Sequence, residues 1–297
     1  MKNNKEVNLT IFTPTYNRAH TLPRVFESLE MQTLKNFEWL IIDDGSTDNT
    51  EEVVNSFYSK ASFPIRYVKQ ENAGKQAAWN KAVGLANGRY FCGLDSDDAL
   101  YSKNNVNEIF DRYINLLQDS EVAGLRFLAF SNIQNDFHGK QLSDDVIICS
   151  WFDEFKDAKN FGERIDVFKT DILKNFLYPV TNKTKFIPEI WFYSKISAAK
   201  YKFAYIPLPL RMFYDDATNN RLGRSELAKH AQGHYISRAT MLKEIPTDVF
   251  LSNPTAWAKS IVRFGQCANL LKVPLDKRVK DTNLGYGVFS YMFGFIK

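Results

Sequence analysis

The first hundred residues alternate apolar runs typical of strands with segments typical of amphipathic helices. The predicted strands cover residues 7–12, 37–42, 65–68 and 90–94. The predicted helices begin near Thr21, Asp48 and Gly74, and Gly88 is expected to end the third in a left-handed cap. Apolar strands separated by helices indicate a mostly parallel sheet that helices cover on both faces, so we expect the α/β class.

The rest of the chain is less regular. Further strands are expected at residues 123–130, 164–168, 203–207 and 210–214, and further helices at residues 190–196, 225–242 and 254–271. Residues 284–296 form a Gly- and aromatic-rich tail. We therefore expect one α/β domain over residues 1–220 and a helical C-terminal extension over residues 221–297.

Polar clusters follow three of the predicted strands directly, at residues 13–18, 43–46 and 95–98. In open parallel sheets the ligand lies beyond the carboxyl ends of the strands. The three loops are therefore expected to converge on one site.

The third cluster, in the sequence RYFCGLDSDDAL, places Asp95, Asp97 and Asp98 within four residues. Carboxylates so close repel one another, and Mg²⁺ or Mn²⁺ would remove that repulsion. A P-loop, a Gly-x-Gly-x-x-Gly dinucleotide motif after the first strand and EF-hand spacing are absent from the sequence. These observations favour a divalent ion that bridges the protein to a diphosphate.

Charge and cysteine content suggest partners and a compartment. Residues 195–297 carry 16 Lys and Arg against 7 Asp and Glu, a net charge of +9, whereas the whole chain carries +4. The basic third suggests an anionic partner, and a solvated surface is the alternative. Three dispersed cysteines fit neither a disulfide framework nor a zinc site, and the polar N-terminus lacks the apolar region of a signal peptide. We expect a cytoplasmic protein, peripheral on the inner face of the plasma membrane if residues 277–297 contact lipid.

Four ordered motifs resemble those of family 2 glycosyltransferases, which have the GT-A fold. They are TPTYNR, IIDDGSTDNT, NAGKQAAWNKAVGLANG and LDSDDAL, and the resemblance is close over residues 7–102. It implies inverting transfer of a sugar, with Mn²⁺ or Mg²⁺, from a nucleotide diphospho-sugar bound by residues 1–102. UDP is the commonest nucleotide of the family. The acceptor side is then residues 103–220.

The resemblance also implies roles for individual residues. Asp97 matches the metal ligand of the DXD motif, and Asp95 reaches the metal or the ribose. One of Asp43 and Asp44 contacts the base, and the other stabilises the turn at residues 44–46. The remaining nucleotide-sugar-binding positions are Thr13, Pro14, Tyr16, Lys75 and Ser96.

Glu189, in the sequence FIPEIW, matches the family's general base. Burial beside Phe186, Ile187 and Trp191 is expected to raise its pKa. The structural alternative is a first-turn glutamate favoured by the helix dipole.

The sequence departs from the family at several positions. Trp79 stands where an Arg is common, and Ile190 where a second acidic residue is common. Asp215 and Asp216 follow the segment after which relatives often have a His, so the third metal ligand is unassigned. Arg221 or Arg224 is an alternative contact for the diphosphate.

The expected activity is sugar transfer to a hydroxyl of a glycan or a lipid-linked oligosaccharide, as in cell-surface polysaccharide synthesis. Two alternatives stay open, a non-catalytic nucleotide- or glycan-binding module and a sugar-phosphate nucleotidyltransferase. The nucleotidyltransferase would need a Gly-rich loop after the first strand, which TPTYNR lacks. No nucleic-acid partner is expected, and a homo-oligomer is left open.

Overall fold

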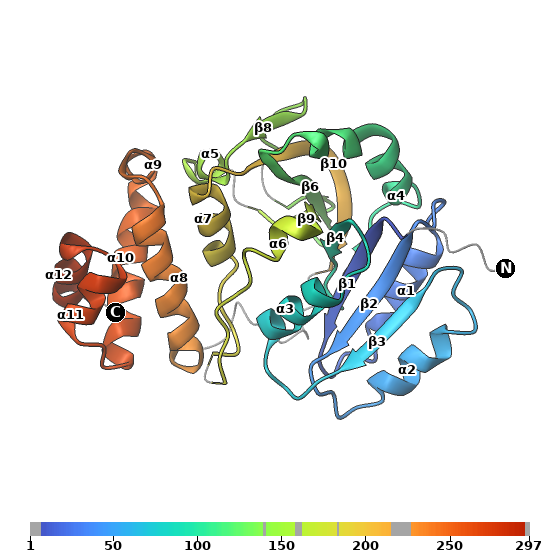
Figure 1. The fold of residues 1–297 in the computed structure, drawn as a ribbon, viewed down its shortest axis with the longest axis horizontal. Coiled ribbons are helices and arrows are strands. Elements are labelled where there is room, and N and C mark those ends of the chain that lie inside the picture. The colour runs from blue at the N-terminus through green and yellow to red at the C-terminus, as the bar shows by residue number, and fades with distance from the viewer. Residues whose placement is uncertain (1–6, 139–140, 158–161, 183, 215–226, 295–297) are drawn as a thin grey trace. The chain divides into compact units, whose positions relative to one another are not determined.

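The computed structural model describes residues 7–138, 141–157, 162–182, 184–214 and 227–294 (Figure 1). The strands are β1 (Leu9–Thr15), β2 (Phe37–Asp43), β3 (Ile65–Lys69), β4 (Tyr90–Gly93), β5 (Ala99–Leu100), β6 (Val122–Ser131), β7 (Asp136–Phe137), β8 (Ile147–Cys149), β9 (Arg164–Lys169) and β10 (Lys202–Phe213). The first helices are α1 (Leu22–Glu30), α2 (Thr50–Phe57), α3 (Lys75–Leu85), α4 (Asn105–Glu108), α5 (Trp151–Phe155) and α6 (Thr170–Leu173). The later helices are α7 (Ile190–Ala198), α8 (Ala231–Glu244), α9 (Thr247–Ser252), α10 (Pro254–Leu270), α11 (Leu275–Asp281) and α12 (Leu284–Phe293), and the helical turn η5 (Leu227–His230) precedes α8.

These strands form one mixed sheet in the order β3-β2-β1-β4-β9-β6-β10-β5. The first four are mutually parallel, as the alternation of strands and helices predicts. Beyond them, β9 runs antiparallel to both β4 and β6, and β10 is parallel to β6. The parallel half therefore carries the expected site, and the other half is mixed.

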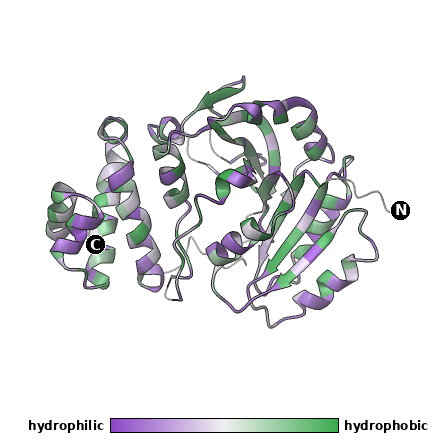
Figure 2. Cartoon of the chain, viewed as in Figure 1, coloured by the Kyte–Doolittle hydropathy of each residue, from purple (hydrophilic) through white to green (hydrophobic). Residues whose placement is uncertain are grey.

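Helices cover both faces of the parallel half. On one face Phe26 of α1 stacks on Phe57 of α2 at a centroid distance of 4.4 Å and lies 6.3 Å from Trp39 of β2. On the other face Phe12 of β1 packs against Trp79 of α3 at 5.9 Å. Every residue of β2 is buried, and Figure 2 shows the central strands largely in the colour of hydrophobic residues. A sheet covered on both faces requires strands that are apolar throughout.

Several expected element ends were wrong. β1 continues through Thr15, because Pro14 keeps its carbonyl for the ladder although it lacks an N–H. Residues 203–207 and 210–214 belong to one strand, β10, whose register shifts at Pro209. Asp48 does not cap α2, which begins after Asn49; its carboxylate accepts from the Thr50 N–H at 3.1 Å instead.

Gly88 does not form the left-handed cap that we expected at the end of α3. The glycines with a positive φ among the described residues are Gly45 and Gly74. A Cβ at Gly88 would lie 2.4 Å from the Thr10 nitrogen. Gly88 is therefore required by the close approach of two backbones and not by its own conformation.

The chain divides into two compact units, and each is described by itself. The first contains Met1–Cys149, Gly162–Leu177 and Lys202–Ala217, and includes the whole described sheet. The second contains Ser150–Phe161, Tyr178–Tyr201 and Thr218–Lys297. The helical unit thus takes in two internal segments besides the C-terminal helices.

Within the second unit α8 packs on α7 and α10, and α12 packs on α10 and α11. Gly265 of α10 and Gly294 approach each other so closely that a Cβ on Gly265 would lie 2.7 Å from the Gly294 Cα. Among the described helices none is both long and apolar enough to cross a membrane. Cys92, Cys149 and Cys267 are all free thiols.

Candidate donor and metal site

The loops that follow β1 and β2 are joined by hydrogen bonds. The Asn17 N–H donates to Ser46 Oγ at 2.9 Å, and the Ala19 N–H donates to Asp48 Oδ2 at 3.2 Å. Asn17 has a φ of 52°, which Asn tolerates better than most residues, and its Oδ1 accepts from the Thr47 N–H at 2.8 Å. The two loops therefore hold each other in place at the carboxyl ends of their strands.

Asp43 and Asp44 both have structural partners inside the first unit. Asp43 is fully buried; its Oδ1 accepts from the Ser46 N–H at 2.7 Å, and its Oδ2 accepts from the Tyr67 hydroxyl. Asp44 accepts from the backbone N–H groups of Ala73 and Gly74, each at 2.8 Å. Both carboxylates thus shape the loops, and the expected contact of one of them with the base stays a prediction.

Lys75 connects the start of α3 to the turn after β4, residues 95–98, which we call the aspartate turn. Its Nζ lies 2.8 Å from Asp95 Oδ1, and both side chains are about one-third exposed. Asp44 binds the backbone of Ala73 and Gly74, which directly precede Lys75, and Lys75 binds Asp95. These contacts link the loop after β2 to the aspartate turn. The expected convergence of the three loops is therefore seen in the first unit.

The aspartate turn brings three carboxylates together after β4. Oxygens of Asp95, Asp97 and Asp98 lie within 4.8 Å of one another, with Asp95 and Asp97 partly exposed and Asp98 buried. Asp98 Oδ2 lies 2.6 Å from Nε of Arg211 in β10. The pKa of Asp98 is raised to about 7, chiefly by burial; the Arg211 charge opposes this increase, and the negative charges of Asp95 and Asp97 add to it.

Two arginines hold this turn from other elements. Arg24 of α1 donates through Nη2 to the Asp97 carbonyl, and its guanidinium lies 3.7 Å from the centroid of the Tyr214 ring. Arg211 also approaches Glu163, with 3.3 Å between Nη2 and Oε2. The sequence reasoning missed both roles. The sequence did contain a signal for each: Arg24 stands among the apolar residues of α1, and Arg211 stands among those of β10.

The other predicted nucleotide-binding residues differ in exposure. Tyr16 is 49% exposed and Pro14 partly exposed, whereas Thr13 and Ser96 are buried. The Thr13 hydroxyl accepts from the Trp39 indole N–H at 2.9 Å, so it faces the sheet interior. Thr15, which was not predicted, has a buried hydroxyl without a hydrogen-bond partner in the described chain, and its register partner is Asp43.

Glu189 belongs to the second unit, at the N-cap position of α7. Its side chain is exposed, although Ile187 and Trp191 beside it are buried. The expected burial of Glu189 was therefore wrong, because these neighbours turn into the core of the helical unit. Its role as a base stays a prediction.

The donor set of the aspartate turn fits a hard divalent cation. Asp95 and Asp97 offer carboxylate oxygens close together and open to solvent, as Mg²⁺ or Mn²⁺ requires. Asp98 is the third carboxylate of the cluster, and its bond to Arg211 gives it a structural task. The pattern Asp-Ser-Asp-Asp thus contains two candidate ligands and one residue that anchors the turn.

The positions that depart from the family pattern have separate outcomes. Trp79 packs edge-on against Phe91 at 5.1 Å, so this position belongs to the contact between α3 and the sheet. Asp215 and Asp216, which follow the segment after which relatives often have a His, lie outside the described residues, as do the alternative diphosphate contacts Arg221 and Arg224.

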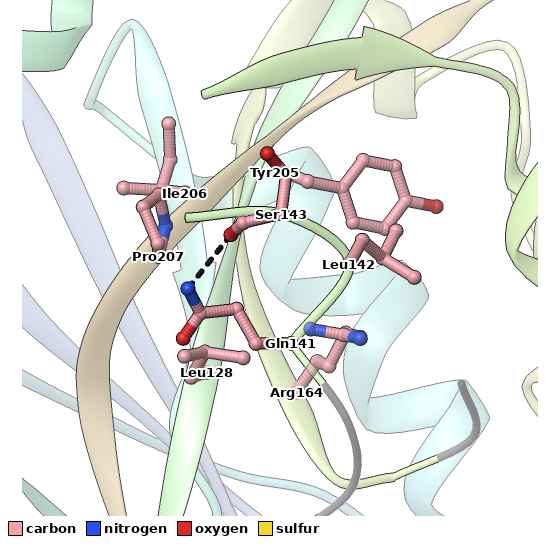
Figure 3. Close-up of a pocket in the computed structure, with 8 residues that line it drawn as sticks. All are labelled: Leu128, Gln141, Leu142, Ser143, Arg164, Tyr205, Ile206 and Pro207. Atoms are coloured by element: carbon pink, nitrogen blue, oxygen red, sulfur yellow. Dashed lines mark hydrogen bonds between the residues drawn. The ribbon is translucent and has the colours of Figure 1, made fainter. Parts of the chain in front are cut away.

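A small pocket lies elsewhere in the first unit (Figure 3). Its cavity volume is about 10 Å³, and it is lined by Leu128, Gln141, Leu142, Ser143, Arg164, Tyr205, Ile206 and Pro207. Gln141 Nε2 donates to the Ser143 carbonyl across it at 2.7 Å. None of the predicted site residues lines this pocket, so it is no part of the candidate site.

Curated relatives are similar to this chain over just more than half of its length. Over 176 residues the chain is 31% identical to the GalNAc(5)-diNAcBac-PP-undecaprenol beta-1,3-glucosyltransferase of Campylobacter jejuni, which covers 56% of this chain and 53% of that protein. Over 168 residues it is 29% identical to glycosyltransferase GlyA of Streptococcus pneumoniae, which covers 57% of this chain and 23% of the relative. The chain thus spans at most about half the length of these relatives.

Solved structures show the same fold. The TarS fragment 1–349 from S. aureus, in complex with UDP, aligns with a TM-score of 0.62 at 15% identity and covers 95% of this chain and 87% of that chain. Mannosyltransferase PcManGT from Pyrobaculum calidifontis, in complex with GDP-Man and Mn²⁺, aligns with a TM-score of 0.56 at 17% identity and covers 96% and 86%. These likenesses confirm the expected α/β architecture of GT-A transferases.

The family model agrees with the motifs and with the fold. The model described as glycosyl transferase family 2 matches residues 10–171, which run from β1 through the aspartate turn to the start of α6. The match takes in more than half of the chain and each of the converging loops. The chain therefore belongs to glycosyl transferase family 2.

Proposed function

We propose that the protein is a metal-dependent, inverting glycosyltransferase that uses a nucleotide diphospho-sugar, with UDP as the nucleotide. Its acceptor is a hydroxyl of a glycan or a lipid-linked oligosaccharide, in the synthesis of a cell-surface polysaccharide. The observation that carries this proposal is the aspartate turn at the carboxyl end of β4, bonded to α3 through Lys75 and to β10 through Arg211.

The donor proposal rests on the turn and on the structures that resemble this chain. TarS has been solved with UDP and with UDP-GlcNAc, and PcManGT with GDP-Man and Mn²⁺. Asp97 and Asp95 would hold the ion, which when bound would offset negative charge on the nucleotide diphosphate. Lys75, which bonds to Asp95, brings a further positive charge to the same place.

Base and ribose are assigned to the loops after β1 and β2. The exposed Tyr16 ring offers a face for stacking, and Asp43 or Asp44 offers a carboxylate oxygen for a base N–H. The buried Thr15 hydroxyl, without a partner in the described chain, is a further polar group beside Asp43.

The acceptor proposal assigns Glu189 as the general base. An exposed carboxylate at the start of a helix can accept a proton from an acceptor hydroxyl that is brought to it. The lipid-linked character of the acceptor is supported by the undecaprenol-linked substrate in the name of the C. jejuni relative.

A lipid-linked acceptor suggests that the protein contacts a membrane surface. We assign this contact to residues 277–297, and we place the protein in the cytoplasm. In α12, Leu284 is 71% exposed and Met292 62% exposed, with Phe289 and Tyr291 about half exposed. An exposed apolar helix face in a basic part of the chain is typical of interfacial membrane binding.

The test of the donor site is the substitution Asp97→Asn, which keeps the shape of the side chain and removes its charge. With a panel of nucleotide-sugars and Mn²⁺, we expect the wild type to release the nucleotide diphosphate and the variant to lose at least 100-fold in rate, because the ion loses a ligand. The measurement is nucleotide release with and without EDTA. The control is Asp171→Asn, at a highly exposed carboxylate on α6. A variant as active as the wild type would refute the assignment of Asp97.

A further inference from the structure

α8 and α10 lie side by side in the second unit (Figure 1). Basic residues recur in a row along α8 and the turn before it. His230, His234 and Arg238 follow one another at intervals of four residues, so they share one face of α8 and the turn before it. Arg263, an exposed residue of α10, is near enough for its charge to lower the pKa of both His234 and Arg238.

The row contains buried nitrogens that no described residue satisfies. Nε of Arg238, Nδ1 of His234 and Nε2 of His230 are out of contact with solvent and have no hydrogen-bond partner in the described chain. The Arg238 Nη1 donates only to uncharged atoms, the Met241 sulfur at 3.0 Å and Ser260 Oγ at 3.4 Å. Buried polar groups are normally paired, so these nitrogens call for a ligand.

The charges around the row have one sign. The groups that act on the His234 charge are Arg238, Arg263 and His230, and burial together with these cations lowers the pKa of His234 to about 4. Burial and Arg263 also lower the pKa of Arg238. Among the described residues no carboxylate pairs with Arg238 or Arg263. The Arg238 side chain is largely removed from solvent, and a guanidinium in such a place without a counter-charge is costly, so we expect an anion to pair with it.

Phosphoryl groups match this set of donors. Guanidinium groups bind them through charge-assisted hydrogen bonds, and neutral imidazoles add further donors. A single carboxylate would leave most of these nitrogens unsatisfied, whereas the oxygens of a diphosphate can reach several of them.

We propose that His230, His234, Arg238 and Arg263 form a binding site for a phosphoryl anion, a diphosphate, in the helical unit. The inference rests on the proposed function in one respect, since a lipid-linked acceptor carries its sugar on a phosphoryl group. These four residues belong to the second unit, whereas the aspartate turn belongs to the first.

The experiment measures binding of inorganic pyrophosphate to the full chain by calorimetry in EDTA, so that no metal is at the aspartate turn. We expect wild-type binding that becomes at least tenfold weaker in Arg238→Met and in Arg263→Met. The control Lys243→Met removes an exposed cation of α8 outside the row and should bind as the wild type does. Asp97→Asn should also bind normally, so that loss of transfer and loss of this site can be told apart.

Thermal unfolding provides a second readout. Without pyrophosphate, Arg238→Met should unfold at a higher temperature than the wild type, because it removes an uncompensated buried charge. Pyrophosphate should stabilise the wild type and leave this variant unchanged. A lower unfolding temperature for Arg238→Met, with unchanged pyrophosphate binding, would show that Arg238 is structural and would overturn the proposal.

Binding of farnesyl diphosphate, compared with that of pyrophosphate, tests whether the bound anion is part of a lipid or a free phosphate. Tighter binding than pyrophosphate, lost in Arg238→Met, would support a polyprenyl diphosphate as ligand. Equal binding of the two, with the same loss, would support a free phosphate as ligand of the same site. Failure of both probes to bind the wild type would refute the site.

Discussion

At the residue scale, three neighbouring aspartates have three different environments. Asp95 pairs with Lys75, Asp97 is held through its carbonyl by Arg24, and Asp98 is buried against Arg211. Repulsion among the carboxylates is therefore reduced by cations from α3 and β10 before any metal is considered. The assignment of different tasks to these aspartates follows from their partners and not from their order in the chain.

Removal of the Arg211 charge should destabilise the first unit. In Arg211→Met the buried Asp98 carboxylate would lose its counter-charge and keep only the Tyr214 N–H as a hydrogen-bond donor, and we expect a loss of about 3 kcal/mol in the free energy of unfolding. The double variant Arg211→Met with Asp98→Asn should recover part of that loss, because no buried charge remains. Urea denaturation of the wild type and both variants measures the effect. A double variant less stable than the single one would contradict this account.

Glu189→Gln tests the general base. We expect binding of the nucleotide-sugar to be unchanged and transfer to fall by roughly 10²- to 10⁴-fold, because the amide cannot take the acceptor proton. The assay combines donor affinity with sugar transfer to a glycan acceptor. Glu244→Gln, at a partly exposed glutamate of α8 in the same unit, is the control. Equal losses in both variants would point to general damage of the helical unit.

At the element scale, backbone contacts decide how α3 leads into β4. Gly88 lies against the β1 backbone, its N–H donates to Thr10 Oγ1 at 2.9 Å, and the Thr170 hydroxyl donates to its carbonyl at 2.7 Å. The helix that begins at Lys75 and the strand that leads to Asp95 are therefore positioned by the same short connection. Strain at Gly88 would be transmitted to both ends of the Lys75–Asp95 pair.

Two glycine substitutions at the end of α3 should have opposite effects. Gly88→Ala should lower the free energy of unfolding by about 2 kcal/mol or more, since its Cβ would meet the Thr10 nitrogen at 2.4 Å. Gly84→Ala, inside the helix with nothing within 4 Å of its new Cβ, should raise it by about 0.5–1 kcal/mol. Thermal and urea unfolding of the pair would check both signs. Equal stability of the two variants would exclude the close approach as the reason for Gly88.

At the scale of the whole molecule, the basic charge of the C-terminal third is only partly available to a partner. Arg278 is buried; it donates to the Val273 carbonyl at 2.9 Å and to Asn269 Oδ1 at 2.7 Å, and so ties α11 to α10. Lys277 pairs with Asp281 at 3.0 Å. The membrane proposal therefore depends more on the exposed apolar face of α12 than on cations before it.

Membrane contact is tested with Leu284→Ser and Met292→Ser combined, which keeps the α12 backbone. We expect the fraction that floats with anionic liposomes to fall several-fold, since each substitution removes apolar area from the lipid-facing side. The matched variant Met31→Ser with Leu251→Ser removes two side chains of similar exposure outside α12. Equal flotation of the wild type and the α12 variant would refute the contact.

The sequence by itself determined the parallel half of the sheet, its helices and the three loops at the strand ends. These features depend on periodicity and on turn residues close together in the chain, as in β2 and the Asp43–Ser46 loop. Only the tertiary structure decided that Arg211 pairs with Asp98, that Glu189 is exposed and that Arg278 is buried. These outcomes depend on the packing of segments distant in the chain. The residues next to Asp98, Glu189 or Arg278 in the sequence do not predict which distant side chains will contact them.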